Sequence, residues 1–103
     1  MGLRIIGTGR ALPRREITNL MLAQLVDTSD EWIAARTGIR SRHVCTDETL
    51  TDLSAAAGGE ALKKAGTDIA RIDLILCSTI GGDCVTPSLA CAVSERLGAS
   101  CPA

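Results

Sequence analysis

The sequence predicts a single α/β domain in which helices cover a mostly parallel sheet. Strand-like and helical patterns alternate along the chain, which is the order expected of layered α/β folds. Residues 72–78 form a nearly continuous apolar run, which is typical of a strand buried on both faces. The length of 103 residues suits one small domain with a modest core, so residues 1–103 are assigned to one domain.

The N-terminal part of the chain predicts one strand followed by two helices. Residues 4–6 favour a short strand that leads into a glycine-containing turn. Residues 18–26 favour a helix, because two good N-cap residues precede a run rich in leucine. The spacing within residues 28–31 is that of a capping box, with Thr28 as its cap, and predicts the start of a second helix. Gly38 supplies the left-handed residue that ends this helix.

The middle of the chain predicts a short extended segment and a longer helix. Residues 40–44 alternate in the manner of a short exposed strand or an extended loop. Residues 51–65 carry apolar side chains at helical spacing, and Gly66 ends the predicted helix. The adjacent Gly58 and Gly59 weaken this helix, which indicates either a close approach by another element or a local weakness.

The C-terminal part of the chain predicts a strand, a loop and a final helix. A loop over residues 81–85 follows the apolar run. The helix begins after residues 86–88, with a cap and with Pro87 in its first turn, and ends at Leu97. Residues 101–103 have the composition of the entry to another strand.

Composition excludes several classes of protein. A net charge of -1 argues against a nucleic-acid or membrane-surface binder, and no apolar run is long enough to span a bilayer. The N-terminus lacks the pattern of a secretory signal, so we expect a cytoplasmic protein. The five cysteines include no CxxC pair and His43 is the only histidine. We therefore expect buried free thiols and keep a structural zinc site as the lesser alternative.

Three sequence features could carry chemistry. Residues 7–9 (Gly-Thr-Gly) resemble the start of a phosphate-binding loop, but Leu12 stands where the full fingerprint needs glycine, so a tight turn is the better interpretation. Residues 1–43 hold seven of the eleven cations beside the only Trp, which suits either an adenine nucleotide or a solvated basic face. Cys84 follows the apolar run and precedes a helix cap, so it is either a nucleophile or an idle thiol.

Longer motifs resemble one enzyme family. The blocks TSDEWI (residues 28–33) and RTGIR (residues 36–40) closely resemble the N-terminal part of β-ketoacyl-acyl carrier protein synthase III, a thiolase-fold condensing enzyme. The similarity continues through residues 72–79 and residues 101–103, and so covers essentially the whole chain. It implies a layered αβαβα fold of which this chain is most of the first half.

The resemblance also implies a function. The family condenses an acyl-CoA, usually acetyl-CoA, with malonyl-acyl carrier protein to start type II fatty-acid synthesis, and it forms homodimers. By resemblance, Trp32 stacks on the CoA adenine, while Arg36, Thr28 and Thr37 help to hold the nucleotide. Coenzyme A enters as a thioester substrate, so no permanently bound cofactor is expected. The loop at residues 84–86 corresponds to one that shapes the acyl pocket near the dimer interface.

The family's catalytic residues are not found in this chain. The family uses a Cys-His-Asn triad whose cysteine forms the acyl-enzyme a short step after the Cys-Pro-Ala motif of residues 101–103, so the nucleophile falls beyond Ala103. His43 does not match the catalytic histidine. We therefore expect no catalytic residue in this segment, and expect it to be unstable or to aggregate alone. The alternatives are a non-catalytic fragment that binds CoA weakly or serves in dimerisation, a polyketide-type condensing enzyme, and a redox or metal protein.

Overall fold

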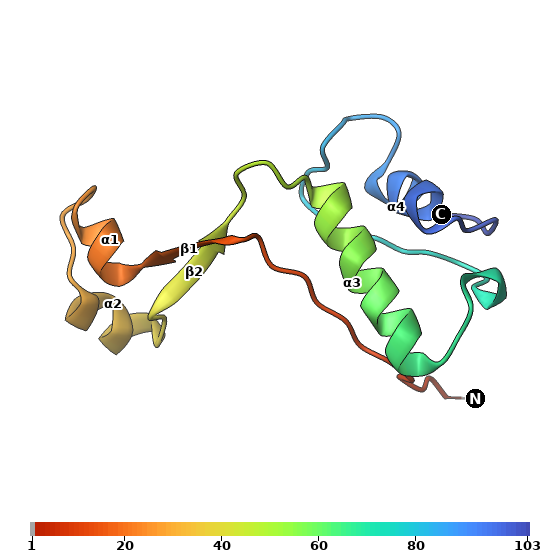
Figure 1. Cartoon of the computed structure of the whole chain (residues 1–103), viewed down its shortest axis with the longest axis horizontal. Helices are drawn as coiled ribbons and strands as arrows, with labels where there is room; N and C mark the ends of the chain where they lie inside the picture. Colours follow the sequence, from red (N-terminus) through yellow and green to blue (C-terminus); the bar gives the residue numbers. More distant parts are fainter. Residues whose placement is uncertain (1) are drawn as a thin grey trace. The chain divides into compact units, whose positions relative to one another are not determined.

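The computed structural model describes residues 2–103, which divide into two compact units. One unit is Leu12–Asp47, and the other combines the residues up to Ala11 with Glu48–Ala103. We call them the arm unit and the helical unit. In chain order the elements are β1 (Arg15–Thr18), α1 (Asn19–Ala23), α2 (Asp30–Thr37), β2 (Ser41–Val44), α3 (Leu50–Ala65), the 3₁₀ turn η1 (Ile69–Arg71) and α4 (Leu89–Leu97) (Figure 1).

The arm unit is built on an antiparallel pair of strands. β1 and β2 pair with Arg15 opposite Val44 and Thr18 opposite Ser41. Of the two alternatives expected for residues 40–44, a short strand or an extended loop, the structure forms the strand, whereas its partner β1 was not predicted. β1 has the sequence REIT, which contains one apolar residue, Ile17, and therefore shows no alternation of apolar and polar residues. Pairing with β2 decides its conformation.

The first helix is shorter than the sequence predicts. Thr18 is its N-cap and accepts a hydrogen bond from the Met21 backbone N–H at 3.2 Å, as expected. The helix ends at Ala23, so the prediction that it extends through residue 26 is wrong. Leu25 and Val26 are exposed, and helical spacing of apolar residues stabilises a helix only where those residues are buried.

The second helix begins one residue later than expected. Ser29, not Thr28, is the N-cap of α2 and accepts a hydrogen bond from the Trp32 N–H at 3.1 Å. The capping box predicted for residues 28–31 is therefore wrong, because the third helical residue is Trp32, which has no acceptor to return. Gly38 ends α2 at a φ of 72°, as predicted.

In the helical unit, α3 matches the prediction to within one residue. A capping box starts it, with Thr49 accepting from the Asp52 N–H and Asp52 accepting from the Thr49 N–H, both at 3.0 Å. Gly66 ends it at a φ of 62°. The extended N-terminal segment runs directly against this helix, because a Cβ atom added at Gly9 would lie 2.0 Å from the Ala57 carbonyl oxygen.

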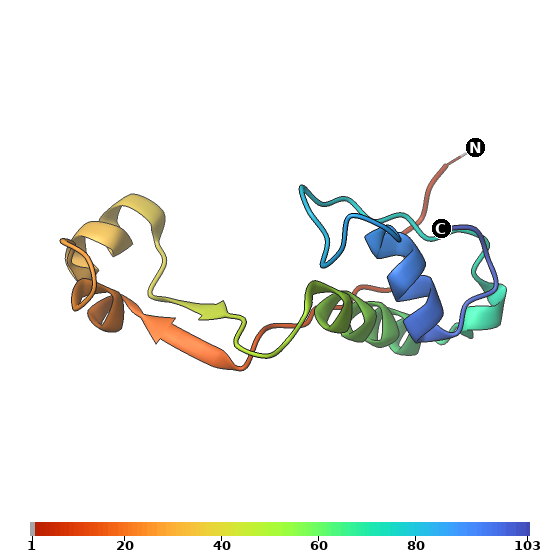
Figure 2. The ribbon, with the colours of Figure 1, turned by 90° about the horizontal axis from the view of Figure 1, so that it is seen from above.

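The core of the helical unit lies where α3 and α4 pack side by side (Figure 2). Ala55 of α3 and Ala90 and Val93 of α4 are buried. Gly58 allows this approach, because a Cβ atom there would lie 3.2 Å from Leu97 Cδ1, whereas Gly59 faces open space. The close approach expected at the glycine pair is confirmed for the first glycine only.

The start of α4 also differs from the prediction. Ser88 is its N-cap and accepts a hydrogen bond from the Cys91 N–H at 3.3 Å. Pro87 therefore precedes the cap, and the prediction that it occupies the first helical turn is wrong. Gly98 ends the helix at a φ of 73°, so its predicted end is confirmed.

The two strands predicted at residues 4–6 and 72–78 are not formed. Both segments are extended but belong to no ladder, and among residues 2–103 the sheet is the antiparallel pair β1–β2 rather than a mostly parallel one. Leu74 and Leu76 are exposed, so burial on both faces is also wrong here. A β-strand forms only where backbone hydrogen bonds to a neighbouring strand repeat along the segment. Residues 72–78 have one such bond to residues 101–103, from the Ile75 N–H to the Pro102 carbonyl at 3.1 Å.

Candidate functional site

The single tryptophan and an arginine form a mixed aromatic and cationic surface on α2. Trp32 and Arg36 are four residues apart, so they lie on the same face of the helix. The guanidinium carbon of Arg36 lies 4.7 Å from the centre of the Trp32 ring. The tryptophan remains 56% exposed, although it is the only aromatic residue of the chain and would be expected in a core. The ring is therefore available to a ligand.

A surface hollow opens beside this ring. It has a volume of about 390 Å³ and is lined by Asp27, Thr28, Ser29 and Trp32. Trp32 offers a flat face to a planar base, and Arg36 next to it offers a cation to a phosphate group. The Thr28 and Ser29 side chains add hydroxyls, although the Ser29 hydroxyl already caps α2. This combination is suited to an adenine nucleotide.

Thr37 plays a structural part at the end of the same helix. Its hydroxyl donates to the Ile33 carbonyl at 2.7 Å and accepts from the Ile39 N–H at 3.1 Å. Its proton is therefore engaged within the arm unit. The structure places Thr28 and Trp32 together at the hollow beside the start of α2, and Arg36 over the Trp32 ring, whereas Thr37 follows Arg36 at the end of the helix. The ligand contacts expected of all four residues stay predictions.

The arginines of the arm unit are not a uniform basic face. Arg14 pairs with Asp47, which lowers the pKa of that carboxyl through a hydrogen bond and the nearby positive charge. Arg40 also forms an ion pair, with its Nη1 atom 3.3 Å from Asp30 Oδ2. A general solvated basic face therefore fits less well than a local cation beside an aromatic ring.

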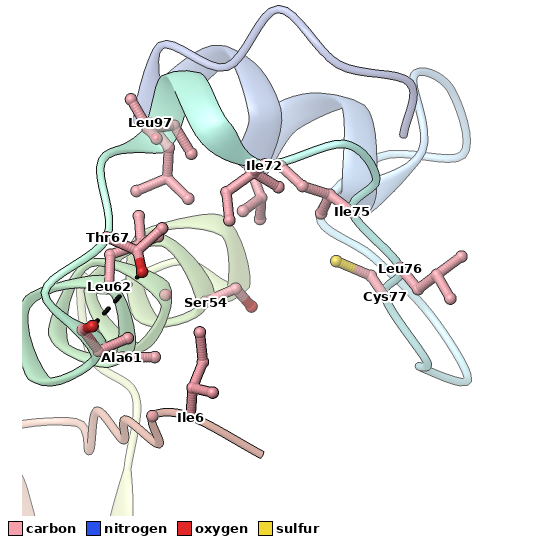
Figure 3. Close-up of a pocket in the computed structure, with 15 residues that line it drawn as sticks. Ile6, Ser54, Ala61, Leu62, Thr67, Ile72, Ile75, Leu76, Cys77 and Leu97 are labelled. Carbon is pink, nitrogen blue, oxygen red and sulfur yellow. Dashed lines mark hydrogen bonds between the residues drawn. The ribbon is translucent and has the colours of Figure 1, made fainter. Parts of the chain in front are cut away.

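A second, apolar pocket lies in the helical unit. Its volume is about 340 Å³, and Figure 3 shows Ile6 and Ile72 turned toward the same space. The Thr67 hydroxyl at its edge donates to the Ala65 carbonyl at 3.4 Å. Its lining comes from the N-terminal segment, α3, α4 and residues 67–77 and includes no charged side chain. This pocket therefore offers burial to an apolar group but no acid or base.

The loop at residues 81–85 is attached to the start of α3 by Asp83. Its carboxylate accepts hydrogen bonds from the Leu50 N–H at 2.9 Å, the Thr51 N–H at 2.8 Å and the Thr51 hydroxyl at 2.6 Å. The Thr51 hydroxyl and these N–H groups lower the pKa of Asp83. Sequence analysis missed this residue, although an acid in a glycine-rich loop after an apolar run could have drawn attention to it.

The five cysteines occupy exposed or half-buried positions of the chain. Cys45, Cys84 and Cys91 are exposed, and Cys77 and Cys101 are half-buried, so the expectation of buried thiols is wrong. They lie in loops, at a helix start and on unpaired extended segments, which bury little. Residues 2–103 contain no cluster of three or more metal-binding side chains. Cys84 lies four residues before Ser88, the N-cap of α4, and is not part of that helix start.

Within residues 2–103, no helix has the length and apolar character that crossing a membrane requires.

No protein-family model matches the chain. Individual proteins, by contrast, match it over nearly its whole length.

Three known proteins illustrate this similarity. The chain is 46% identical over 100 residues to β-ketoacyl-[acyl-carrier-protein] synthase III of Vesicomyosocius okutanii, a match that covers 97% of this chain and 32% of that protein. The crystal structure of 3-oxoacyl-[acyl-carrier-protein] synthase III from Aquifex aeolicus matches with a TM-score of 0.93 and 42% identity, over 98% of this chain and 33% of that one. The priming β-ketosynthase of the R1128 polyketide pathway matches with a TM-score of 0.91 and 42% identity, over 97% of this chain and 30% of that one.

The chain thus spans about a third of the length of the relatives that it matches. The similarity in sequence and the similarity in fold agree, and they extend over the motif-bearing residues of the arm unit as well as the helical unit. The layered thiolase-like fold expected from the sequence is confirmed as that of its structural relatives. This chain is accordingly a relative of β-ketoacyl-acyl carrier protein synthase III and corresponds to the N-terminal segment of that thiolase-fold enzyme.

Proposed function

We propose that this chain supplies the nucleotide-binding part of a condensing acyltransferase that uses coenzyme A thioesters. The observation that carries the proposal is the contact between Arg36 and the exposed Trp32 ring, 4.7 Å apart beside the hollow at Thr28. In this proposal Trp32 stacks on the adenine, Arg36 and Thr28 hold the phosphates, and Thr37 acts through the backbone at the end of α2. Coenzyme A is a substrate and no permanent cofactor is required.

The reaction that we propose for the complete protein is that of β-ketoacyl-acyl carrier protein synthase III. An acyl group, with acetyl as the first choice, passes from the sulfur of CoA to a cysteine thiolate, and CoA is released. Decarboxylation of malonyl-acyl carrier protein releases CO2 and supplies a carbanion, which attacks the carbonyl carbon of the acyl-cysteine and displaces the cysteine thiolate, so that β-ketoacyl-acyl carrier protein is formed. By resemblance to the family, we place that cysteine a short step after the Cys-Pro-Ala motif of residues 101–103, and so beyond residue 103. The partners are then acyl-CoA and malonyl-acyl carrier protein, the protein is a cytoplasmic homodimer, and nucleic acid and membrane have no part.

Calorimetric titration of variants with CoA tests the proposal. In the complete protein, Trp32→Ala should weaken CoA binding by about fivefold or more, because base stacking on an aromatic side chain contributes ~1–3 kcal/mol. Trp32→Phe keeps an aromatic face and should retain part of the affinity. Leu25→Ala, which truncates an exposed residue of the same unit outside the hollow, is the control and should change nothing. Equal CoA affinity in Trp32→Ala and the parent protein would show that α2 does not bind the nucleotide.

A polyketide-type condensing enzyme is the second candidate. It is favoured by the R1128 priming ketosynthase, which matches this chain at the same 42% identity as the Aquifex enzyme. Both candidates use acyl-CoA, so the nucleotide site does not separate them. Acyl-transfer assays of the complete protein with acetyl-CoA and with longer or branched acyl-CoA thioesters would separate a fatty-acid initiator from a polyketide enzyme by the preferred chain.

A non-catalytic role is the third candidate. Intact-mass spectrometry of the purified protein, including any polypeptide that copurifies, decides whether these residues occur with a catalytic cysteine-bearing part. A polypeptide about three times longer, as in the relatives, supports the enzyme. The chain of 103 residues by itself would support a fragment that binds CoA or serves in dimerisation.

A further inference from the structure

The most buried polar side chain of the arm unit is hydrogen-bonded to residues at the ends of α2, the helix that carries the proposed nucleotide site. Asn19, the first residue of α1, is only 1% exposed, and it is the only asparagine in the chain. A buried amide is stable only where its donors and its acceptor all have partners. Asn19 meets that requirement through bonds to both ends of α2.

Both polar atoms of the Asn19 amide have hydrogen-bond partners. Its Nδ2 donates to Asp30 Oδ1 and to the Ile39 carbonyl oxygen, each at 2.8 Å. Its Oδ1 accepts from Arg42 Nη2 at 2.7 Å. The Asn19 backbone N–H also donates to the Arg40 carbonyl at 3.1 Å.

These partners surround the helix that carries the site. Asp30 is the first residue of α2, Ile39 and Arg40 follow Gly38 at its end, and Arg42 lies on β2. One side chain therefore holds the start of α2, the turn after it and the strand that follows. Because hydrogen bonds are directional, they restrict the rotation of α2 about its own axis.

Packing alone would leave that rotation poorly determined. Ile33 is the only residue of α2 that is buried, so the helix has one apolar anchor. Trp32 is next to Ile33 in sequence, and a turn of the helix about this anchor would move the Trp32 ring and Arg36 away from Thr28. The polar contacts of Asn19 supply the second anchor.

We propose that Asn19 is a positioning residue for the CoA nucleotide site: it orients α2 so that Trp32 faces the hollow at Thr28, with Arg36 over the Trp32 ring. This inference rests on the proposed function, because it assigns the effect to the nucleotide end of CoA. It touches no ligand itself. Neither an aspartate nor a leucine can replace it, because aspartate lacks the donors for Asp30 and Ile39, and leucine lacks both donors and acceptor.

Titration with the two ends of CoA tests this role on the full-length protein. The probes are adenosine 3′,5′-bisphosphate for the nucleotide end and pantetheine for the other end. Asn19→Asp should weaken the binding of adenosine 3′,5′-bisphosphate by about tenfold. The affinity for pantetheine should stay within about twofold of that of the parent protein, since only the orientation of α2 is disturbed. Equal losses for both probes, or no loss for either, would overturn the proposal.

Further variants keep the test decisive if Asn19→Asp folds poorly. In the double variant Asn19→Asp, Asp30→Asn, the new amide can donate to the new carboxylate, so part of the nucleotide affinity should return. Arg42→Gln removes one partner of Asn19 Oδ1 and leaves the amide in place, so it should give a smaller loss confined to the nucleotide probe. The lack of recovery in the double variant, together with an Arg42→Gln variant that binds normally, would reject the role.

The Trp32→Ala variant separates the two hypotheses. If it binds adenosine 3′,5′-bisphosphate normally, the nucleotide site itself is wrong and the role of Asn19 is wrong with it. If it binds weakly while both Asn19→Asp and Arg42→Gln bind normally, only the positioning role is wrong. Far-UV circular dichroism of each variant confirms that the helices are retained.

Discussion

Arg96 of α4 and Asp52 of α3 form an ion pair across the helical unit, with Arg96 Nη1 2.6 Å from Asp52 Oδ1. The same carboxylate closes the capping box at the start of α3 by accepting from the Thr49 N–H. The Arg96 hydrogen bond, followed by those with Thr49, lowers the pKa of Asp52 to about 2 from 3.8. The Asp52 side chain thus both caps the start of α3 and binds α4 to α3 through Arg96.

This pair predicts a loss of stability in acid. The folded pKa of Asp52 lies below its unfolded value, so its contribution is present above pH 3.8 and is lost as the pH falls toward about 2. Arg96→Gln removes the largest cause of the lowered pKa and should make the acid-induced loss shallower. Thermal unfolding of the complete protein is followed by circular dichroism from about pH 6 to about pH 2 and measures the slope. An unchanged slope would show that the pair does not contribute in solution.

A second prediction concerns the contact between the N-terminal segment and α3. A Cβ atom at Gly9 would lie 2.0 Å from the Ala57 carbonyl oxygen and 2.6 Å from the Ala61 nitrogen, both of which are backbone atoms that cannot move independently. Gly9→Ala should therefore destabilise the protein by about 1–3 kcal/mol through overpacking. Gly2→Ala is the matched control, since nothing lies within 4 Å of its Cβ position. Urea denaturation of the two variants, each made in the complete protein, compares them, and equal midpoints would mean that the segment leaves α3 in solution.

A third prediction distinguishes the two neighbouring glycines of α3. Gly59→Ala meets open space and should stabilise the protein by about 0.5–1 kcal/mol, because alanine loses less backbone entropy in a helix. Gly58→Ala brings a methyl group 3.2 Å from Leu97 Cδ1 and should gain less, or lose stability, because the α3–α4 contact must widen. Differential scanning calorimetry of the complete protein ranks the variants. A larger gain at Gly58 would contradict the packing described here.

A fourth prediction concerns the cation beside the tryptophan ring. Arg36→Gln removes the guanidinium above Trp32 that we propose holds a phosphate, and should weaken CoA binding by about tenfold or more, because a hydrogen bond to a charged group contributes ~1.5–3 kcal/mol. The control is Arg15→Gln, which removes an exposed arginine on β1. The two variants are compared by titration with CoA. If both lose affinity equally, the effect is general charge and not local recognition.

A fifth prediction concerns residues 1–103 produced alone. Leu3, Leu76, Ile80 and Val85 are almost wholly exposed, and the extended segments carry unpaired backbone groups. We expect the isolated polypeptide to aggregate or to unfold without a sharp transition. Analytical ultracentrifugation and thermal unfolding measure this. A monomer with sharp, cooperative unfolding would show that these exposed surfaces neither cause aggregation nor prevent stable folding.

Helix boundaries were predictable because local chemistry sets them. Gly38, Gly66 and Gly98 each adopt the left-handed conformation at a helix end that the sequence predicted. Where two neighbouring residues can both cap, local chemistry did not decide, and Ser29 rather than Thr28 caps α2. The apolar spacing of residues 20–26 predicted too long a helix, because burial was assumed and Leu25 is exposed.

The candidate site was predictable only in part. The sequence by itself determined the residue types, with one Trp near arginines within a family motif, and so indicated Trp32 and Arg36. The contact of the Arg36 guanidinium with the Trp32 ring follows from their four-residue spacing on one helix. Only the tertiary structure decided that Asp83 holds its loop to α3 and that Asn19 joins both ends of α2. Helix caps depend on neighbours within a few residues, whereas these contacts and the strand ladders depend on groups distant in the chain, whose positions only folding determines.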